Sequence, residues 1–198
     1  MTFIRRNILY FQNTDPSNAK CVIEAVKERL NLGGIEAVLI PITTGKTAEL
    51  FSDELKGKAG VIGIPESEVI GVCNLIARSK GGFFGSLVDD RLAEATERLR
   101  REAFDIVLLP FCGENWDAAK ELFHVFGQGM KVALEITIAA VELKKIPSGT
   151  RVISVGGTKG GADTAIVVKT SMQSEAFGSE LAKRLSIEEI LAMPLQKW

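Results

Sequence analysis

The sequence predicts an α/β fold, a three-layer sandwich in which helices cover both faces of a mostly parallel sheet. Two observations favour it. Apolar runs typical of strands alternate along the chain with amphipathic helical segments, and these runs are uniformly apolar, as in strands that are buried on both faces. We expect a single α/β domain over 1–198, because 198 residues fit one compact unit and no linker or repeat interrupts them.

The first half of the chain reads as strands and helices in turn. Strands are predicted at 4–11, 35–42 and 59–64, and a helix is predicted at about 45–56. The first helix is expected to start at Asp15 as N-cap with Pro16 at its first position, and to end at Gly33 and Gly34. Its apolar positions recur every three or four residues, at Ala19, Val22, Ile23, Val26 and Leu30.

The middle of the chain is harder to assign. The pattern over 66–90 is ambiguous, whereas 91–103 reads as a helix and 105–110 as a strand. Helices follow at 115–126 and 130–146, and the second is apolar nearly all round, which is typical of a buried helix.

The last part is predicted to hold strands at 151–155 and 164–170 and a short helix at 186–191. The two strands are joined by a glycine-rich connection of eight residues, too short for a parallel crossover. We therefore expect them to be antiparallel neighbours, and they give the sheet an antiparallel edge strand.

Composition excludes several classes of protein. Lys and Arg number 24 against 25 Asp and Glu, and no basic run exceeds two residues, which argues against a nucleic-acid partner. No apolar run approaches the roughly 18 residues of a membrane span, and the first residues are too short an apolar stretch for a signal peptide. The 3 scattered cysteines fit a reduced, cytoplasmic chain, and a single histidine disfavours metal sites and a histidine-based triad.

The loop after the second predicted strand is a candidate anion site. Open α/β sheets bind ligands at the carboxyl ends of their strands, and helix N-termini favour negative charge. Its hydroxyl, backbone and lysine groups suit a phosphate or a carboxylate: Thr43, Thr44, Gly45, Lys46 and Thr47. The end of this loop is similar to a P-loop, but Ile40 stands where that motif needs its first glycine. A capped turn with a solvated lysine remains an equal alternative.

The glycine-rich connection is the second candidate. Its glycines let the backbone approach a ligand, and successive N–H groups can form an anion nest. The candidate residues are Gly156, Gly157, Thr158, Gly161, Ala162, Asp163 and Thr164. The spacing is wrong for a dinucleotide fingerprint and no helix follows. A flexible hairpin loop is the competing interpretation.

Glu135 stands in the middle of the apolar helical segment, where a carboxylate is costly to bury unless it is paired. Pairing with Lys131, one turn earlier, is the default expectation; the alternative is that Glu135 accepts hydrogen bonds from a loop or a ligand. Weaker candidates are a cysteine near a helix start, the single histidine, an acidic pair and an aromatic pair: Cys112, His124, Asp89, Asp90, Phe83 and Phe84. Each is more simply explained by packing, capping or burial.

Several motifs, taken in order, resemble a known family. They are TTGKTA at 43–48, QGMKVALEI at 128–136, IP at 146–147, VGGT at 155–158, GADTA at 161–165 and ILAMP at 190–194. Nearly the whole chain resembles the C-terminal α/β domain of pyruvate kinase, and it is closer still to stand-alone archaeal and bacterial proteins of that type. The motifs of the second half are the more specific ones.

The resemblance implies ligand binding without pyruvate kinase activity. The active site of pyruvate kinase lies in a barrel domain for which 198 residues leave no room. In that enzyme the threonine loop holds the phosphate of a sugar-phosphate effector, a role that would fall here to residues 43–47. Some stand-alone relatives hold flavin mononucleotide (FMN). They carry a His-His-Ala-Gly-Phe-like loop after the third strand, whereas this chain reads GIPESE at 63–68, and carboxylates there would repel a phosphate.

Three functions follow from the sequence. The leading hypothesis is the binding of a small phosphorylated molecule through the two strand-end loops, with no catalysis assigned and no certain cofactor. The alternative is an FMN-binding flavoprotein, an oxidoreductase whose flavin supplies the chemistry. The third is an interaction module, a homo-oligomer in which the apolar helix 130–146 packs against another copy.

Overall fold

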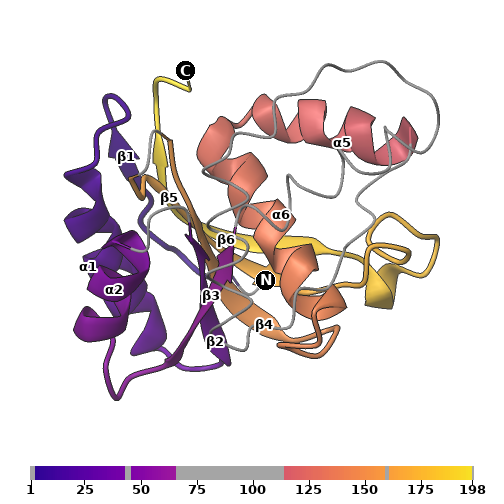
Figure 1. The fold of residues 1–198 in the computed structure, drawn as a ribbon, viewed down its shortest axis with the longest axis horizontal. Helices are drawn as coiled ribbons and strands as arrows, with labels where there is room; N and C mark the ends of the chain where they lie inside the picture. Colours follow the sequence, from indigo (N-terminus) through magenta and orange to yellow (C-terminus); the bar gives the residue numbers. More distant parts are fainter. Residues whose placement is uncertain (1–2, 43–45, 66–113, 159–160, 198) are drawn as a thin grey trace, which may run out of the picture.

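A computed structural model describes residues 3–42, 46–65, 114–158 and 161–197 of the chain (Figure 1). The described residues form one six-stranded sheet in the order β1-β6-β5-β4-β2-β3. Its strands are β1 (Leu9–Phe11), β2 (Ala37–Ile42), β3 (Gly60–Pro65), β4 (Arg151–Gly156), β5 (Thr164–Lys169) and β6 (Ser186–Pro194). All of them run in one direction except β5, which is antiparallel to both of its neighbours.

Helices cover both faces of this sheet (Figure 1). They are α1 (Asn18–Leu30), α2 (Lys46–Glu54), α5 (Glu114–His124) and α6 (Gln128–Glu142), and a short 3-10 turn spans Leu181–Lys183. Helices α1 and α2 bury one apolar cluster against the sheet, and α6 buries the other, with α5 packed on α6. The predicted α/β class and mostly parallel sheet are confirmed.

Helix α1 forms close to where the sequence predicts it. Asp15 is not its N-cap: that position is taken by Ser17, whose amide donates to Asp15 Oδ1 at 2.8 Å. At the other end the chain leaves the helix through Gly33 and Gly34, whose φ angles are +73° and +72°. Other residues rarely adopt this left-handed backbone, so the two glycines end the helix as expected.

Helix α6 is the most deeply buried helix described, as its apolar sequence predicts. All but a few of its side chains are buried, and it packs on β4 and β2. A hydrogen bond fixes its position on the sheet: the Ser154 hydroxyl of β4 donates to the Ala133 carbonyl at 2.7 Å. Because its apolar surface is covered within the chain, α6 gives no reason to expect an oligomer, and the oligomeric state stays a prediction.

Two linked expectations are wrong. Residues 186–191 are not a helix but the first part of strand β6, which pairs with β5 along most of its length and with β1 at its end. Strand β5 is antiparallel to β4 as predicted, but it is not an edge strand, because β6 lies on its other side. Short apolar segments do not reveal their period, and here pairing with two strands overrides the helical tendency of Glu188 and Glu189.

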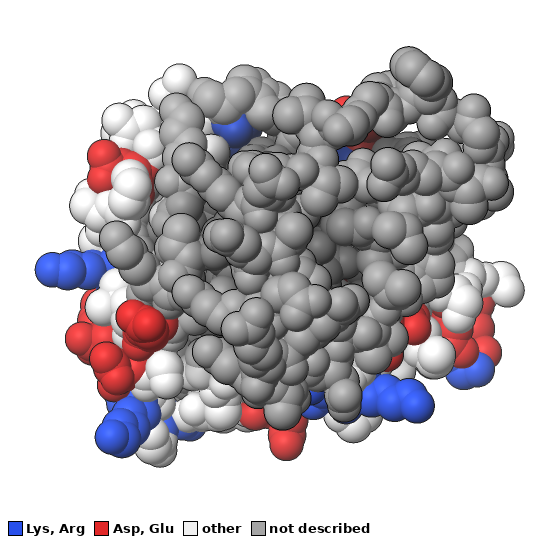
Figure 2. Space-filling view, viewed as in Figure 1, with Lys and Arg blue, Asp and Glu red and all other residues white. Residues whose placement is uncertain are grey.

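The predicted elements at 91–103 and 105–110, and the ambiguous stretch 66–90, lie outside the described residues. In the ranges that the structure does describe, no helix has the length and apolar character needed to cross a membrane. Basic and acidic side chains are interspersed around the described part of the face shown in Figure 2, which agrees with the net charge of −1.

Candidate functional site

The carboxyl ends of the parallel strands meet at one edge of the sheet. Strands β1, β2, β3, β4 and β6 end there, and antiparallel β5 begins there. The predicted glycine-rich connection from β4 to β5 therefore lies at this edge. Strand β2 is the neighbour of β4, so the threonine loop and the glycine-rich connection leave adjacent strands at the same edge of the sheet.

One side of the glycine-rich connection packs against the first turn of α6. A Cβ on Gly156 would lie 1.9 Å from the Gly129 carbonyl oxygen and 3.0 Å from the Ala133 amide nitrogen. A Cβ on Gly129 would in turn lie 2.2 Å from Thr164 Oγ1 and 2.5 Å from Asp163 Oδ1. Helix and connection touch backbone to backbone, so these glycines are needed for packing whether or not a ligand binds.

The other side packs against the segment that leads into α1. A Cβ on Gly161 would lie 2.7 Å from the Cα of Pro16. Within the connection, a Cβ on Gly157 would lie 1.5 Å from the Gly161 carbonyl oxygen, and the Asp163 amide donates to the Gly156 carbonyl at 3.1 Å. The described parts of the connection, residues 156–158 and 161–163, thus pack between the N-termini of two helices that cover opposite faces of the sheet.

Asp163 is the central polar residue of this edge. Its carboxylate is almost fully buried, and its Oδ1 accepts the Thr164 hydroxyl at 2.8 Å and faces the first turn of α6. Burial raises the pKa of Asp163, and the hydrogen-bonding groups of Thr164 and Thr158 offset part of that rise. Thr158 Oγ1 and Asp163 Oδ2 are both buried, and they lie close enough for Thr158 to lower the Asp163 pKa although neither atom meets strict hydrogen-bond geometry.

Lys197 is a cation at this edge that the sequence gave no reason to select. Its side chain packs on Gly127, which precedes α6 with a φ of +105° and would bring a Cβ to 3.3 Å from Lys197 Cδ. Its Nζ donates to the Pro194 carbonyl at 2.5 Å, burial lowers its pKa, and the charge of Asp163 acts in the opposite sense. Its position three residues beyond β6 could be foreseen only once that strand was known.

The threonine loop is described only in part. Thr43, Thr44 and Gly45 lie outside the described residues. Helix α2 begins at Lys46, directly after the carboxyl end of β2, so its N-terminus lies at the same edge, and Thr47 is partly buried in its first turn. Helix α2 is thus the third helix, after α6 and α1, whose N-terminus lies at this edge.

Glu135 does not belong to this cluster of residues. Successive helical positions differ by about 100°, so Glu135 points away from the sheet when Ala133, two residues earlier, faces it. The expected pairing with Lys131 is wrong: Glu135 Oε1 lies 4.0 Å from Lys120 Nζ of α5, and both side chains are largely buried. Glu135 therefore lies between α6 and α5.

Of the weaker candidates, only His124 lies among the described residues. His124 ends α5, and its Nε2 is hydrogen-bonded to Gln128 Oε1, which makes it a structural contact between α5 and α6. The remaining ones, Cys112, Asp89, Asp90, Phe83 and Phe84, lie outside the described residues. In the described ranges, no group of three or more His, Cys, Asp or Glu side chains is arranged to hold a metal ion.

These groups can bind but show no means of catalysis. The described part of the edge offers backbone amides at helix N-termini, hydroxyls, one buried carboxyl group and one lysine, without a nucleophile held by a base. No model of a known protein family matches the chain.

Proposed function

We propose that the chain binds a small phosphorylated molecule at the carboxyl edge of its sheet, and that its fold is of the pyruvate kinase C-terminal domain type. One observation carries the binding proposal. The glycine-rich connection lies between the first turn of α6 and the segment that leads into α1, and α2 begins at the same edge. Three helix N-termini and a backbone rich in glycine therefore converge.

Phosphate suits this edge for electrostatic reasons. The first-turn amides of a helix lack partners within it, and the helix dipole adds partial positive charge there. No side chain caps α6, whose N-cap residue is Gly127. Lys197 adds a cation, and Lys46 stands at the start of α2.

Asp163 sets a condition on this proposal, because an ionised carboxylate would repel a phosphate. Burial raises its pKa, which favours the neutral form, and an approaching phosphate would favour that form further. A neutral carboxyl group donates a hydrogen bond to a phosphate oxygen. Together with the Thr158 hydroxyl, which lies beside it, Asp163 then supplies two buried polar groups at this edge.

The described residues fit the phosphate of FMN as they fit any phosphate ester, but nothing among them favours the flavin ring. The cavity that the structure describes lies where β1 begins and α1 ends, away from this edge. FMN is therefore one ligand to test.

Calorimetric titration tests the proposal with a sugar bisphosphate, FMN and inorganic phosphate as ligands. We expect saturable binding of at least one phosphate ester. Changing Lys46→Ala and Thr158→Ala should each weaken it about tenfold, the scale of one hydrogen bond to a charged group. Lys56→Ala, a lysine just beyond the other end of α2, is the matched control and should bind as the parent does. Unchanged affinity in both test variants would refute the assignment.

A further inference from the structure

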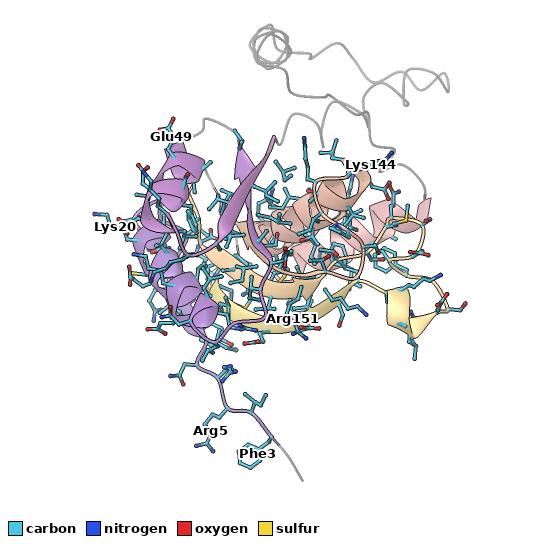
Figure 3. All side chains as sticks on the ribbon, turned by 90° about the horizontal axis from the view of Figure 1, so that it is seen from below. Phe3, Arg5, Lys20, Glu49, Lys144 and Arg151 are labelled. Atoms are coloured by element: carbon cyan, nitrogen blue, oxygen red, sulfur yellow. The ribbon has the colours of Figure 1, made fainter. Side chains whose placement is uncertain are left out.

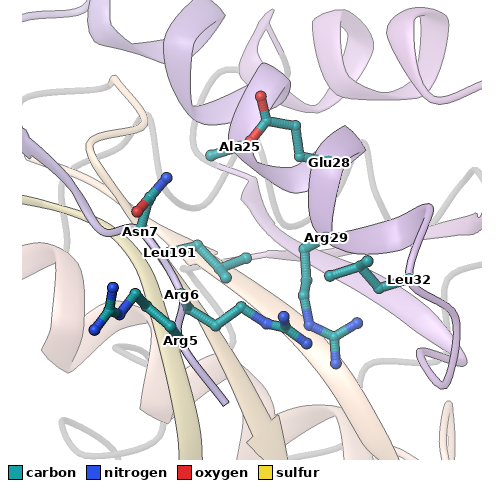
Figure 4. Close-up of a pocket in the computed structure, with 8 residues that line it drawn as sticks. All are labelled: Arg5, Arg6, Asn7, Ala25, Glu28, Arg29, Leu32 and Leu191. Atoms are coloured by element: carbon teal, nitrogen blue, oxygen red, sulfur yellow. The ribbon is translucent and has the colours of Figure 1, made fainter.

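A cavity of about 220 Å³ lies where β1 begins and α1 ends (Figure 4). The segment before β1 lines it with Arg5, Arg6 and Asn7, and the last turns of α1 line it with Glu28 and Arg29. Figure 3 shows the segment of residues 3–8 leaving the body of the molecule in an extended form, with Arg5 outside that body. The cavity lies away from the glycine-rich connection, which leaves the carboxyl ends of the strands.

One carboxylate holds two of the three guanidinium groups. Arg29 is almost fully buried; its Nε donates to Glu189 Oε1 at 2.8 Å and its Nη1 donates to the Gly33 carbonyl at 2.9 Å. Arg6 Nε lies 3.4 Å from the other oxygen of Glu189. Glu189 stands on β6, so its carboxylate joins β6, α1 and the N-terminal segment. Its hydrogen bond and that of the Gly33 carbonyl fix the orientation of the buried Arg29 guanidinium.

The guanidinium of the third arginine, Arg5, extends away from those of Arg6 and Arg29 (Figure 4). Arg5 lines the same cavity and makes no ion pair with a described residue. The charged groups that face the cavity are Arg5, Arg6 and Arg29 against Glu28 and Glu189, an excess of positive charge. The C-terminal end of α1 adds partial negative charge, which Arg29 in its last turn offsets.

The remaining wall is apolar and is formed by Ala25, Leu32 and Leu191. At about 220 Å³ the cavity is smaller than the roughly 300–1,000 Å³ of pockets for drug-sized ligands, so it suits a small organic molecule. Guanidinium groups recognise carboxylates and phosphates because their planar donors match the oxygen spacing of both.

We propose that this cavity is a second ligand site, which takes a small oxyanion with a short apolar or hydroxylated body. Arg6 contacts the oxyanion, Arg29 presents its fixed guanidinium from the cavity wall, and the body of the ligand lies on Leu32 and Leu191. Arg5 adds positive charge at the border of the cavity. This site is independent of the one proposed at the carboxyl edge.

NMR titration of the arginine Nε–H signals tests the proposal, because these signals report on the cavity and not on the carboxyl edge. The full chain is titrated separately with inorganic phosphate and with succinate, so that the two sources of an oxyanion are distinguished. We expect the signals of Arg5, Arg6 and Arg29 to shift together and to saturate with at least one of the two probes. Added salt should weaken the binding, since two of the arginines are exposed.

Single arginine substitutions test whether the oxyanion binds in this cavity. Arg5→Ala and Arg6→Ala alter exposed side chains outside the helices and strands. Arg6→Ala removes a direct contact and should weaken binding about tenfold, and Arg5→Ala removes a more distant charge and should weaken it less. Arg184→Ala is the control: Arg184 is exposed, donates to the Gly178 carbonyl and does not line the cavity. The proposal is overturned if neither probe gives saturable shifts up to about 10 mM. It is equally overturned if binding persists unchanged in both arginine variants.

Discussion

The sharpest structural prediction concerns Gly156, where β4 meets α6. In Gly156→Ala the new Cβ would lie 1.9 Å from the Gly129 carbonyl oxygen, whereas ordinary contact begins at 3.4 Å. The obstacle is helix backbone, so a rotamer change cannot relieve it, and α6 must move by about 1.5 Å. That movement would disturb the Ser154–Ala133 hydrogen bond and the apolar cluster beneath α6.

Overpacking of a core costs about 1–3 kcal/mol, and occasionally more. Because the clash here is with backbone, we expect Gly156→Ala to lose about 3 kcal/mol or more. For a chain of this size that loss lowers the melting temperature by roughly 6–12 °C. The free energy of unfolding is measured by urea denaturation followed by circular dichroism.

Gly60→Ala is the matched control, because Gly60 also lies in a strand of this sheet and a Cβ there meets nothing within 4 Å. That variant should lie within about 1 kcal/mol of the parent, or slightly above it in stability. Equal urea midpoints for Gly156→Ala and Gly60→Ala would refute the argument that the glycine-rich connection is closed by packing on α6.

Three further predictions follow from the described contacts. Glu189→Gln should cost about 3 kcal/mol because it leaves the buried Arg29 without its carboxylate, while Glu188→Gln, whose partner Arg151 is exposed, should cost under about 1 kcal/mol; urea midpoints compare the two. Asp163 has a raised pKa, so the folded chain holds this proton more tightly than the unfolded chain, and the contribution of Asp163 to stability decreases as the pH rises above 3.8. The stability of Asp163→Asn relative to the parent should therefore increase from pH 4 to pH 7, and a difference independent of pH would contradict the burial of a titrating carboxyl group. Phe51→Ala should cost about 3–5 kcal/mol, because Phe51 is fully buried between α2 and the sheet, whereas the exposed neighbour Ser52→Ala should be close to neutral in the same assay.

Five of the described elements could be predicted because their local signals agree with one another. Uniformly apolar runs mark β2, β3, β4 and β5, and an apolar stripe that ends at two glycines marks α1. The eight-residue connection also sets the antiparallel pairing of β4 and β5, because chain length alone excludes a crossover.

The order of the last strands could not be predicted, because it depends on β6. Its first residues, Ser186 to Leu191, include Glu188 and Glu189, which suggest a helix until Arg151 and Arg29 are seen to pair with them. Those partners lie far away in sequence, so no local pattern reveals them. Because a helix was expected at 186–191 in place of β6, β5 was wrongly expected to be an edge strand.

The contacts of the candidate site residues could not be predicted from the sequence for the same reason. The glycines of 156–161 were selected for backbone approach to a ligand, and the backbone that approaches them includes that of α6 and Pro16. Glu135 was selected because a buried carboxylate needs a partner, which is Lys120 of α5 and not Lys131 of its own helix. In both cases the residue was correctly selected as constrained, while its partner depended on tertiary structure.

Binding of a phosphorylated ligand at the carboxyl edge is the central claim, and one calorimetric comparison tests it most directly. The parent chain and the Thr158→Ala and Lys46→Ala variants are titrated with the phosphate ester that the parent binds best, with Lys56→Ala as control. The account predicts saturable binding to the parent and the control, and affinities about tenfold weaker in the two test variants. Equal affinities in all four proteins, or no saturable binding of any phosphate ester to the parent, would contradict it.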